Sequence, residues 1–161
     1  MIKLYHGSDT FIEVPDLNRC KPFKDFGKGF YLSADRKQAE LLAVQRCRQT
    51  LKDIPVVNEF LFDDFAMTSG ELKVLCFKDY SEDWVRFVLA NRDMYATHSI
   101  HDYDIVFGPI ADDSVTFQLR RFQRGVIRTI DELIAELRYE KGITFQYYFG
   151  TQRALNKLVK L

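Results

Sequence analysis

Two short segments near the start of the chain hold the side chains best suited to chemistry. The first, Tyr5-His6-Gly7-Ser8, places an imidazole and a hydroxyl on either side of a glycine. A glycine has no Cβ, so a ligand can approach its backbone closely, while the imidazole and the hydroxyl can donate hydrogen bonds. The segment therefore predicts a polar clamp for a small ligand. A surface turn with an incidental histidine is the alternative, and the segment alone does not decide between them.

The second segment spans residues 25–33 and reads Asp-Phe-Gly-Lys-Gly-Phe-Tyr-Leu-Ser. Its glycine pair lacks the third glycine, the preceding strand and the directly following helix that a dinucleotide-binding fingerprint requires. The chain also contains no Walker-type phosphate loop. Standard nucleotide-binding folds are therefore disfavoured. A glycine pair alone often only marks turns, so the two segments are more specific together than apart.

Taken together, residues 4–8 and residues 25–35 resemble the ADP-ribosyltransferase superfamily of the diphtheria-toxin and poly(ADP-ribose) polymerase type. The resemblance is strong over these two segments and weak through the middle of the chain. The whole chain is also similar to a small bacterial group assigned to this superfamily. The resemblance implies split antiparallel sheets with flanking helices.

Members of that superfamily hold NAD+ with a His-Tyr-Glu triad. The resemblance implies that His6 contacts the nicotinamide ribose and that Tyr31 stacks on the nicotinamide ring. It also implies that the Gly7 backbone and Ser8 contact the carboxamide. His6 and Tyr31 are then expected to converge on opposite sides of a slot. The set expected to contact NAD+ is His6, Gly7, Ser8, Arg19, Gly29, Tyr31 and Ser33.

Arg19 belongs to this set through its charge. The loop from residue 18 to residue 28 carries four cations, Arg19, Lys21, Lys24 and Lys28. They can neutralise the pyrophosphate of NAD+ or receive a polyanionic target. A solvated surface is the commoner explanation for such a cluster.

The polymerase-type enzymes have a second tyrosine on the next helix, which stacks on the other face of the nicotinamide. This chain offers Leu42 in that region, so one stacking face is expected to be apolar.

Gln146 is the candidate for the third triad position, and there the sequence departs from the family pattern. In the family the glutamate bonds the ribose 2′-hydroxyl and stabilises the oxocarbenium-like transition state. A glutamine keeps the hydrogen bond without the charge, which removes about 2 to 4 kcal/mol, or about 30- to 1,000-fold in rate. Some superfamily members that lack the glutamate still act as mono-ADP-ribosyltransferases, whereas chain elongation is associated with the acidic residue. The resemblance therefore implies transfer of single ADP-ribose units. Replacing Gln146 by Glu is expected to raise nicotinamide release; an ordinary solvent-facing strand residue is the alternative.

Apolar spacing indicates the elements that position these residues. Residues 2–6 predict a strand ending at His6, residues 9–28 a long ordered loop, and residues 30–32 a second strand. A helix is expected from Ser33 or Asp35 to Leu51. Its inward positions are expected to be Ala39, Leu42, Ala43, Cys47 and Leu51.

The rest of the chain mixes strands and helices. Strands are predicted at residues 71–78, 103–110 and 143–149, and helices at residues 81–91, 112–125 and 129–142. Residues 151–159 have helical spacing, with a strand as the alternative. This order is not the regular alternation of a doubly wound sheet, so it predicts an α+β fold. A chain of 161 residues with 47% hydrophobic content indicates one domain, residues 1–161.

Composition excludes several classes of function. The 23 basic and 23 acidic side chains balance, so no overall field draws the protein to nucleic acid or to an anionic membrane. No stretch approaches the roughly 20 apolar residues of a membrane span, and the N-terminus lacks a signal-peptide pattern, so a cytoplasmic protein is expected. No metal is expected, because Cys20, Cys47 and Cys76 lack ligand spacing and His98 and His101 have no further ligands.

The leading hypothesis is an NAD+-dependent mono-ADP-ribosyltransferase with His6, Tyr31 and Gln146 as catalytic residues and NAD+ as co-substrate. The resemblance also implies a toxin neutralised by an antitoxin protein. The acceptor, protein or nucleic acid, is not indicated by any residue. Two other classes stay open: a non-catalytic module that binds NAD+ or ADP-ribose, and a nucleic-acid binder that uses the basic loop.

Overall fold

The computed structural model describes residues 1–139 and 142–161. The described residues form seven strands in two sheets, together with five α-helices and two short 3-10 helices. This confirms the predicted α+β class, and the two separate sheets agree with a split arrangement. No helix in these two ranges is long and apolar enough to span a membrane.

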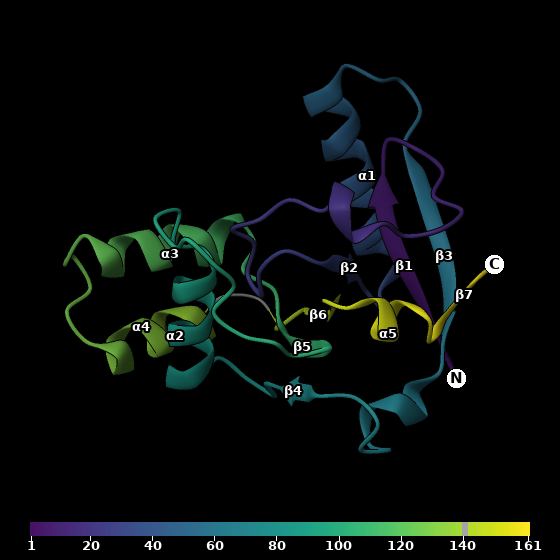
Figure 1. The fold of residues 1–161 in the computed structure, drawn as a ribbon. Helices are drawn as coiled ribbons and strands as arrows, with labels where there is room; N and C mark the ends of the chain where they lie inside the picture. Colours follow the sequence, from purple (N-terminus) through teal and green to yellow (C-terminus); the bar gives the residue numbers. More distant parts are fainter. Residues whose placement is uncertain (140–141) are drawn as a thin grey trace.

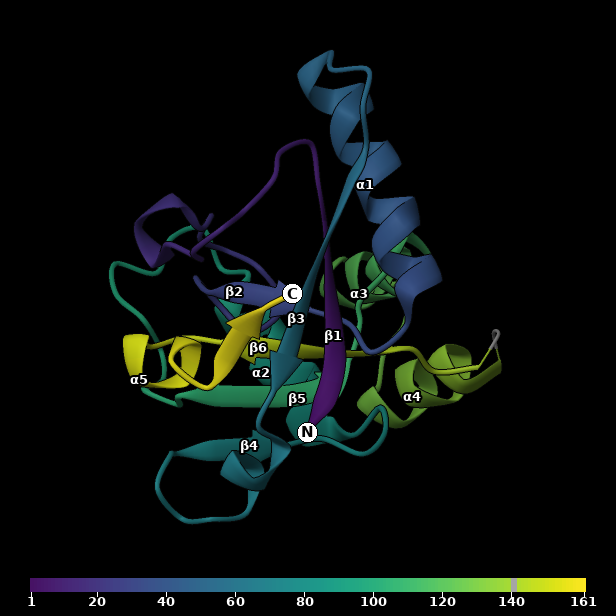
Figure 2. The ribbon, with the colours of Figure 1, turned by 90° about the vertical axis from the view of Figure 1, so that its right-hand side faces the viewer.

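A three-stranded antiparallel sheet carries the first of the two candidate segments. Its strands are β1 (Ile2–Ser8), β3 (Val56–Phe62) and β7 (Leu158–Lys160), in the order β1-β3-β7. Helix α1 (Arg36–Thr50) lies along β1 and projects with β1 and β3 to one end of the molecule (Figures 1 and 2). The Asp35 side chain caps this helix by accepting from the Lys37 backbone.

A four-stranded sheet carries the second segment. Its strands are β2 (Phe30–Leu32), β6 (Phe145–Phe149), β5 (Ile105–Pro109) and β4 (Val74–Cys76), in the order β2-β6-β5-β4. Strand β2 is therefore an edge strand. The pairs β2/β6 and β5/β6 are antiparallel, but β4 and β5 run parallel. The expectation of purely antiparallel sheets is wrong at that pair, because α2 lies between β4 and β5 in the chain and makes the crossover.

Three helices gather on the far side of the four-stranded sheet from α1 (Figure 1). They are α2 (Glu82–Asn91), α3 (Asp113–Gln123) and α4 (Ile130–Tyr139). Ser81, Asp112 and Thr129 accept hydrogen bonds from backbone N–H groups at the first turns of these helices. The predicted continuation of the last helix through residues 140–141 lies outside the described residues. A short helix α5 (Gln152–Leu155) precedes β7, so the tail contains both alternatives that were left open.

Two apolar clusters lie on opposite faces of the four-stranded sheet. Phe30 and Leu32 belong to the cluster between the two sheets, whereas Tyr31 packs against the cluster under α2, α3 and α4. This alternation is the normal pleat of a strand, in which neighbouring side chains point to opposite faces. The placement of Tyr31 follows from it.

Several details of the fold differ from the predictions. The first strand was predicted to end at His6, but β1 continues to Ser8, which pairs with Val56 of β3. Strand β3 was not predicted at all, and helix α1 buries Ala39, Ala43 and Cys47 but leaves Leu42 and Leu51 exposed. Leu51 is 92% exposed because it forms the C-cap of α1 in the left-handed conformation, at φ 55°. The expectation that these two leucines face the core is therefore wrong.

Candidate functional site

The two candidate segments meet where β1 crosses the edge of β2. The backbone of Tyr5 exchanges two hydrogen bonds with that of Ser33, at 2.8 and 2.9 Å, forming an isolated bridge between the two sheets. Ser33 is buried, and its hydroxyl donates to Gln38 of α1 at 2.7 Å. Residues 5–6 and residues 30–33 thus form one junction.

His6 is fixed at this junction by its ring nitrogen. Its Nδ1 lies 2.7 Å from the Tyr31 carbonyl oxygen, which can only accept, so Nδ1 carries the proton and Nε2 is the acceptor nitrogen. The ring stacks on Phe30 with centroids 4.5 Å apart. Burial lowers the pKa of His6, and the charge of Arg46 lowers it further, so the imidazole is neutral near neutral pH.

His6 and His101 are both expected to make the folded protein less stable in acid. Burial also lowers the pKa of His101, whose Nε2 lies 2.8 Å from the Phe26 carbonyl and whose Nδ1 accepts from the Tyr103 backbone. A folded-state pKa below the unfolded value of about 6.5 means full stability above that pH and a loss as pH falls through and below it. We expect the melting temperature to fall below about pH 6.5, and less steeply in His101→Asn. Identical acid profiles for the variant and the wild type would contradict this.

Tyr31 is held at both its ring and its hydroxyl. The hydroxyl donates to the Gly27 carbonyl at 2.7 Å and accepts from the Phe26 backbone at 3.0 Å. The ring packs against Phe26 and edge-on against Tyr148, with centroids 6.3 and 5.4 Å away. Burial raises the pKa of Tyr31 well above its usual value, and the charge of Asp25 adds to the rise. The phenol is therefore a neutral, rigid wall rather than an acid or base.

Gln146 lies on the same face of the sheet as Tyr31. Tyr31 is paired with Tyr148 across the β2/β6 ladder, and Gln146 is two residues before Tyr148 on β6, so the pleat directs all three side chains to one face. Gln146 is buried, and its Nε2 donates to Asp25 Oδ2 at 2.8 Å. The alternative of a solvent-facing strand residue is thereby ruled out.

Asp25 begins the second candidate segment, but no role was expected for it. Its carboxylate is buried and accepts from Arg92 at 2.6 Å, from the Ala111 backbone at 3.0 Å and from Gln146. Asp25 and Arg92 are 67 residues apart in the chain, and no local pattern links them. The four cations of this loop are exposed, whereas its buried carboxylate anchors the loop to the helical side of the sheet.

Both glycines of the candidate set have packing roles. A Cβ on Gly7 would lie 2.7 Å from the Ala43 backbone nitrogen and closer still to the Ala39 carbonyl oxygen. A Cβ on Gly29 would enter the ring of Tyr148 and lie 2.8 Å from the Phe149 carbonyl oxygen. The space beside each glycine is thus filled by the chain itself. The absent Cβ of Gly7 serves the close approach of α1, not that of a ligand.

The remaining candidates are less closely associated. Ser8 is buried and bonds within its own turn, to Asp9 and Thr10. Arg19 ends the exposed 3-10 helix Leu17–Arg19. In the part of the chain that the structure describes, no three His, Cys, Asp or Glu side chains gather as metal ligands, and Cys20, Cys47 and Cys76 are free thiols.

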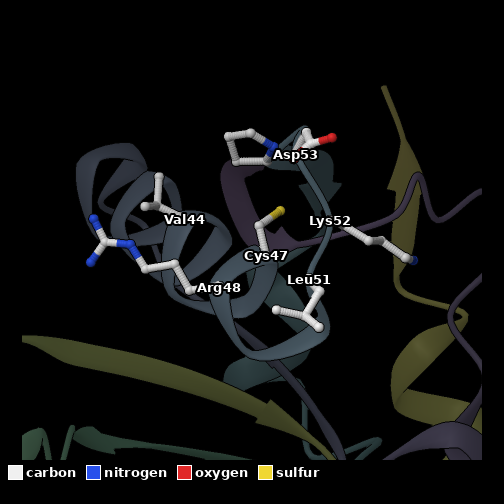
Figure 3. A pocket seen from close by; sticks show the side chains of 7 residues that line it. Val44, Cys47, Arg48, Leu51, Lys52 and Asp53 are labelled. Carbon is white, nitrogen blue, oxygen red and sulfur yellow. The ribbon is translucent and has the colours of Figure 1, made fainter.

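Two surface hollows lie away from these residues. One lies at the C-terminal end of α1 and is lined by Val44, Cys47, Arg48, Leu51, Lys52, Asp53 and Pro55 (Figure 3). The other lies beside α5 and β7. None of the residues predicted for the site lines either hollow. Leu42, the expected apolar stacking face, is 48% exposed on α1.

The structure thus brings together part of the predicted set. His6, Tyr31 and Ser33 meet at the β1/β2 junction, and Gln146 joins Tyr31 on one face of the sheet. His6, however, stacks on Phe30, whose ring lies on the other face. The rings of His6 and Tyr31 therefore do not converge on opposite sides of a slot, as had been expected. A ligand in contact with His6, Tyr31 and Gln146 would have to reach both faces of β2 at the edge that β1 contacts.

The comparisons with known proteins give one match. No curated protein and no solved structure matches the chain. A family described as a protein of unknown function, DUF3990, matches residues 2–160. Because this match covers nearly the whole sequence, the chain belongs to the DUF3990 family.

Proposed function

We propose that this protein is a mono-ADP-ribosyltransferase that uses NAD+ as its co-substrate. The observation that carries the proposal is the hydrogen bond from His6 Nδ1 to the Tyr31 carbonyl oxygen, 2.7 Å long. It joins the two residues that the sequence resemblance assigns to NAD+, and it fixes the tautomer of His6. Two things therefore support the proposal: the resemblance of residues 4–8 and 25–35 to the superfamily, and the hydrogen bond that joins these two segments.

The proposed roles follow from the polar atoms at the junction. His6 Nε2, unprotonated, accepts a hydrogen bond from a hydroxyl of the nicotinamide ribose. Tyr31, whose hydroxyl is bonded within the chain, offers only its ring as a rigid surface beside the nicotinamide. Gln146 bonds the ribose 2′-hydroxyl. Nicotinamide leaves with the electron pair of its glycosidic bond, and an acceptor attacks C1′ of the ribose.

One observation favours a second function, a non-catalytic module that binds NAD+ or ADP-ribose. The sequence resemblance puts a neutral residue, Gln146, at the position of the family's glutamate, and the neighbouring carboxylate of Asp25 is paired with Arg92. Charge stabilisation of the transition state is then weak, whereas ribose binding by neutral donors and acceptors is unaffected.

Nicotinamide release and thermal stabilisation separate the two functions. For the transferase we expect release of nicotinamide from NAD+, measured by chromatography, that is lost in Tyr31→Ala and largely kept in Tyr31→Phe, which retains the ring. For the binding module we expect an NAD+-dependent rise in melting temperature without release. The proposal of NAD+ chemistry is refuted if NAD+ produces neither effect.

The acceptor is best sought directly. We propose a cytoplasmic setting and a protein or nucleic-acid acceptor, with a toxin neutralised by an antitoxin as the biological context. Mass spectrometry of a cell lysate incubated with the protein and isotope-labelled NAD+ identifies the class of acceptor by the mass of one ADP-ribose unit per site.

A further inference from the structure

The Gln146 amide can face Asp25 in only one orientation. A carboxylate oxygen accepts and never donates, so the amide nitrogen must point to Asp25 and the amide oxygen Oε1 must point away. We propose that Asp25 is a positioning residue, held by Arg92, that fixes Gln146 with Oε1 presented as the acceptor for the 2′-hydroxyl of the NAD+ ribose. This role rests on the proposed transferase function.

The contacts around Asp25 are those of a fixed group. Arg92 reaches Oδ1 with two of its nitrogens, at 2.9 and 2.6 Å, while Oδ2 takes the Ala111 backbone N–H and Gln146. Arg92 in turn donates to Thr116 Oγ1 and to the Ala111 carbonyl oxygen. Both carboxylate oxygens and the guanidinium are thus committed, so neither side chain can rotate without losing several hydrogen bonds.

The same arrangement gives Gln146 part of what a glutamine lacks. An N–H that donates to a carboxylate polarises its own amide and makes the amide oxygen a stronger acceptor. Asp25 therefore makes the Gln146 amide oxygen more negative, at the position that the resemblance assigns to the family's glutamate, without itself touching the ribose. Arg92 pairs with the buried carboxylate and compensates its charge.

This placement changes the expectation for Gln146→Glu. The new carboxyl lies at hydrogen-bond distance from Asp25, and two carboxylates so close cannot both ionise freely, so the pKa of the new group is raised. The other ionisable groups on this face include Arg92, Tyr31, Tyr148 and His101, whose ring lies 5.6 Å from that of Tyr148. Contrary to the expectation from sequence alone, we expect Gln146→Glu not to raise nicotinamide release.

The first test compares two buried carboxylates. Asp25→Ala is expected to lower kcat for nicotinamide release about tenfold or more while the KM for NAD+ changes by less than about threefold. The control is Asp104→Ala, which removes a buried carboxylate that bonds the Lys73 backbone and Thr151 instead. If Asp104→Ala lowers kcat as much as Asp25→Ala does, the loss is one of folding and the positioning role is wrong.

The second test needs no activity. In Gln146→Glu a raised pKa of the new carboxyl makes the folded state lose stability as pH rises through it. The melting temperature of Gln146→Glu, taken relative to wild type, is therefore expected to fall between about pH 5 and about pH 9. The double variant Asp25→Asn/Gln146→Glu is expected to lose this slope, because the like charge is gone.

The outcomes separate this role from the proposed function. A profile of Gln146→Glu that runs parallel to wild type shows that Asp25 does not face residue 146, and it overturns the positioning role even if nicotinamide release is intact. Absence of nicotinamide release from the wild-type protein overturns the transferase function, and the role of Asp25 in it, whatever the melting profiles show.

Discussion

Replacing His6 with alanine is expected to lower nicotinamide release at least about 100-fold while the fold persists. The reason lies in the two ring nitrogens. Nδ1 bonds the Tyr31 carbonyl oxygen at 2.7 Å, and the proposed mechanism uses Nε2 to hold the ribose while the glycosidic bond breaks. Alanine removes both contacts. Release is measured by chromatography of the reaction mixture, and folding by the melting temperature.

A second substitution separates the structural contact from the proposed chemical one. The side-chain amide of His6→Asn can still donate to the Tyr31 carbonyl oxygen, as Nδ1 does, but it has no atom in the place of Nε2. We expect this variant to lose activity as His6→Ala does and to melt close to the wild-type temperature. The control is His98→Ala, since His98 is exposed and bonds its neighbour Thr97. Wild-type release by His6→Asn would remove His6 from the mechanism.

The parts of the fold that follow from local rules were predicted from the sequence. The helices begin one residue after a capping side chain, as at Asp35, Ser81 and Asp112, because a cap depends on a few neighbouring residues. Strand β2 was predicted at its three residues because its apolar run is bounded by a glycine and a serine.

Strand β3 was missed because a buried polar residue interrupts its apolar pattern. Asn58 is fully buried, with its amide bonding the backbones of Ile12 and Thr10, at 2.7 and 3.1 Å. Those partners lie in the long loop, more than 40 residues away in the chain, so the sequence gives no sign that an asparagine there is satisfied. Alternation of Asn58, Phe60 and Phe62 inward becomes visible only in the folded chain.

The sequence singled out the two segments of the candidate site, but not how their side chains are arranged in space. His6, Tyr31 and Ser33 meet because their motifs lie on two strands that cross. Asp25 could not be found, since the Arg92 and Gln146 that define its role lie 67 and 121 residues away. In the sequence alone, nothing distinguishes the buried carboxylate of Asp25 from the solvated acidic side chains elsewhere in the chain.

The packing of α1 depends on a single hydrogen atom at Gly7, and Gly7→Ala is expected to destabilise the protein by about 3 kcal/mol or more. The added methyl carbon would lie 2.7 Å from the Ala43 backbone nitrogen and even nearer the Ala39 carbonyl oxygen. Both are backbone atoms inside a helix, so they cannot rotate away and α1 must move as a body. The expected fall in melting temperature is about 6 to 12 °C.

The same close approach explains why α1 presents its leucines to solvent. Only small side chains fit between α1 and β1, so Ala39 and Ala43 face inward and Leu42 is turned out. The close approach also provides a control. A methyl on residue 7 clashes with backbone atoms of α1, so a smaller side chain on α1 cannot relieve the clash. Gly7→Ala/Ala43→Gly is expected to be no more stable than Gly7→Ala. Gly142→Ala, whose new methyl meets no atom of the described residues within 4 Å beyond its chain neighbours, is expected to change stability by less than about 0.5 kcal/mol. If Gly7→Ala melted like Gly142→Ala, α1 would not lie against β1 as described.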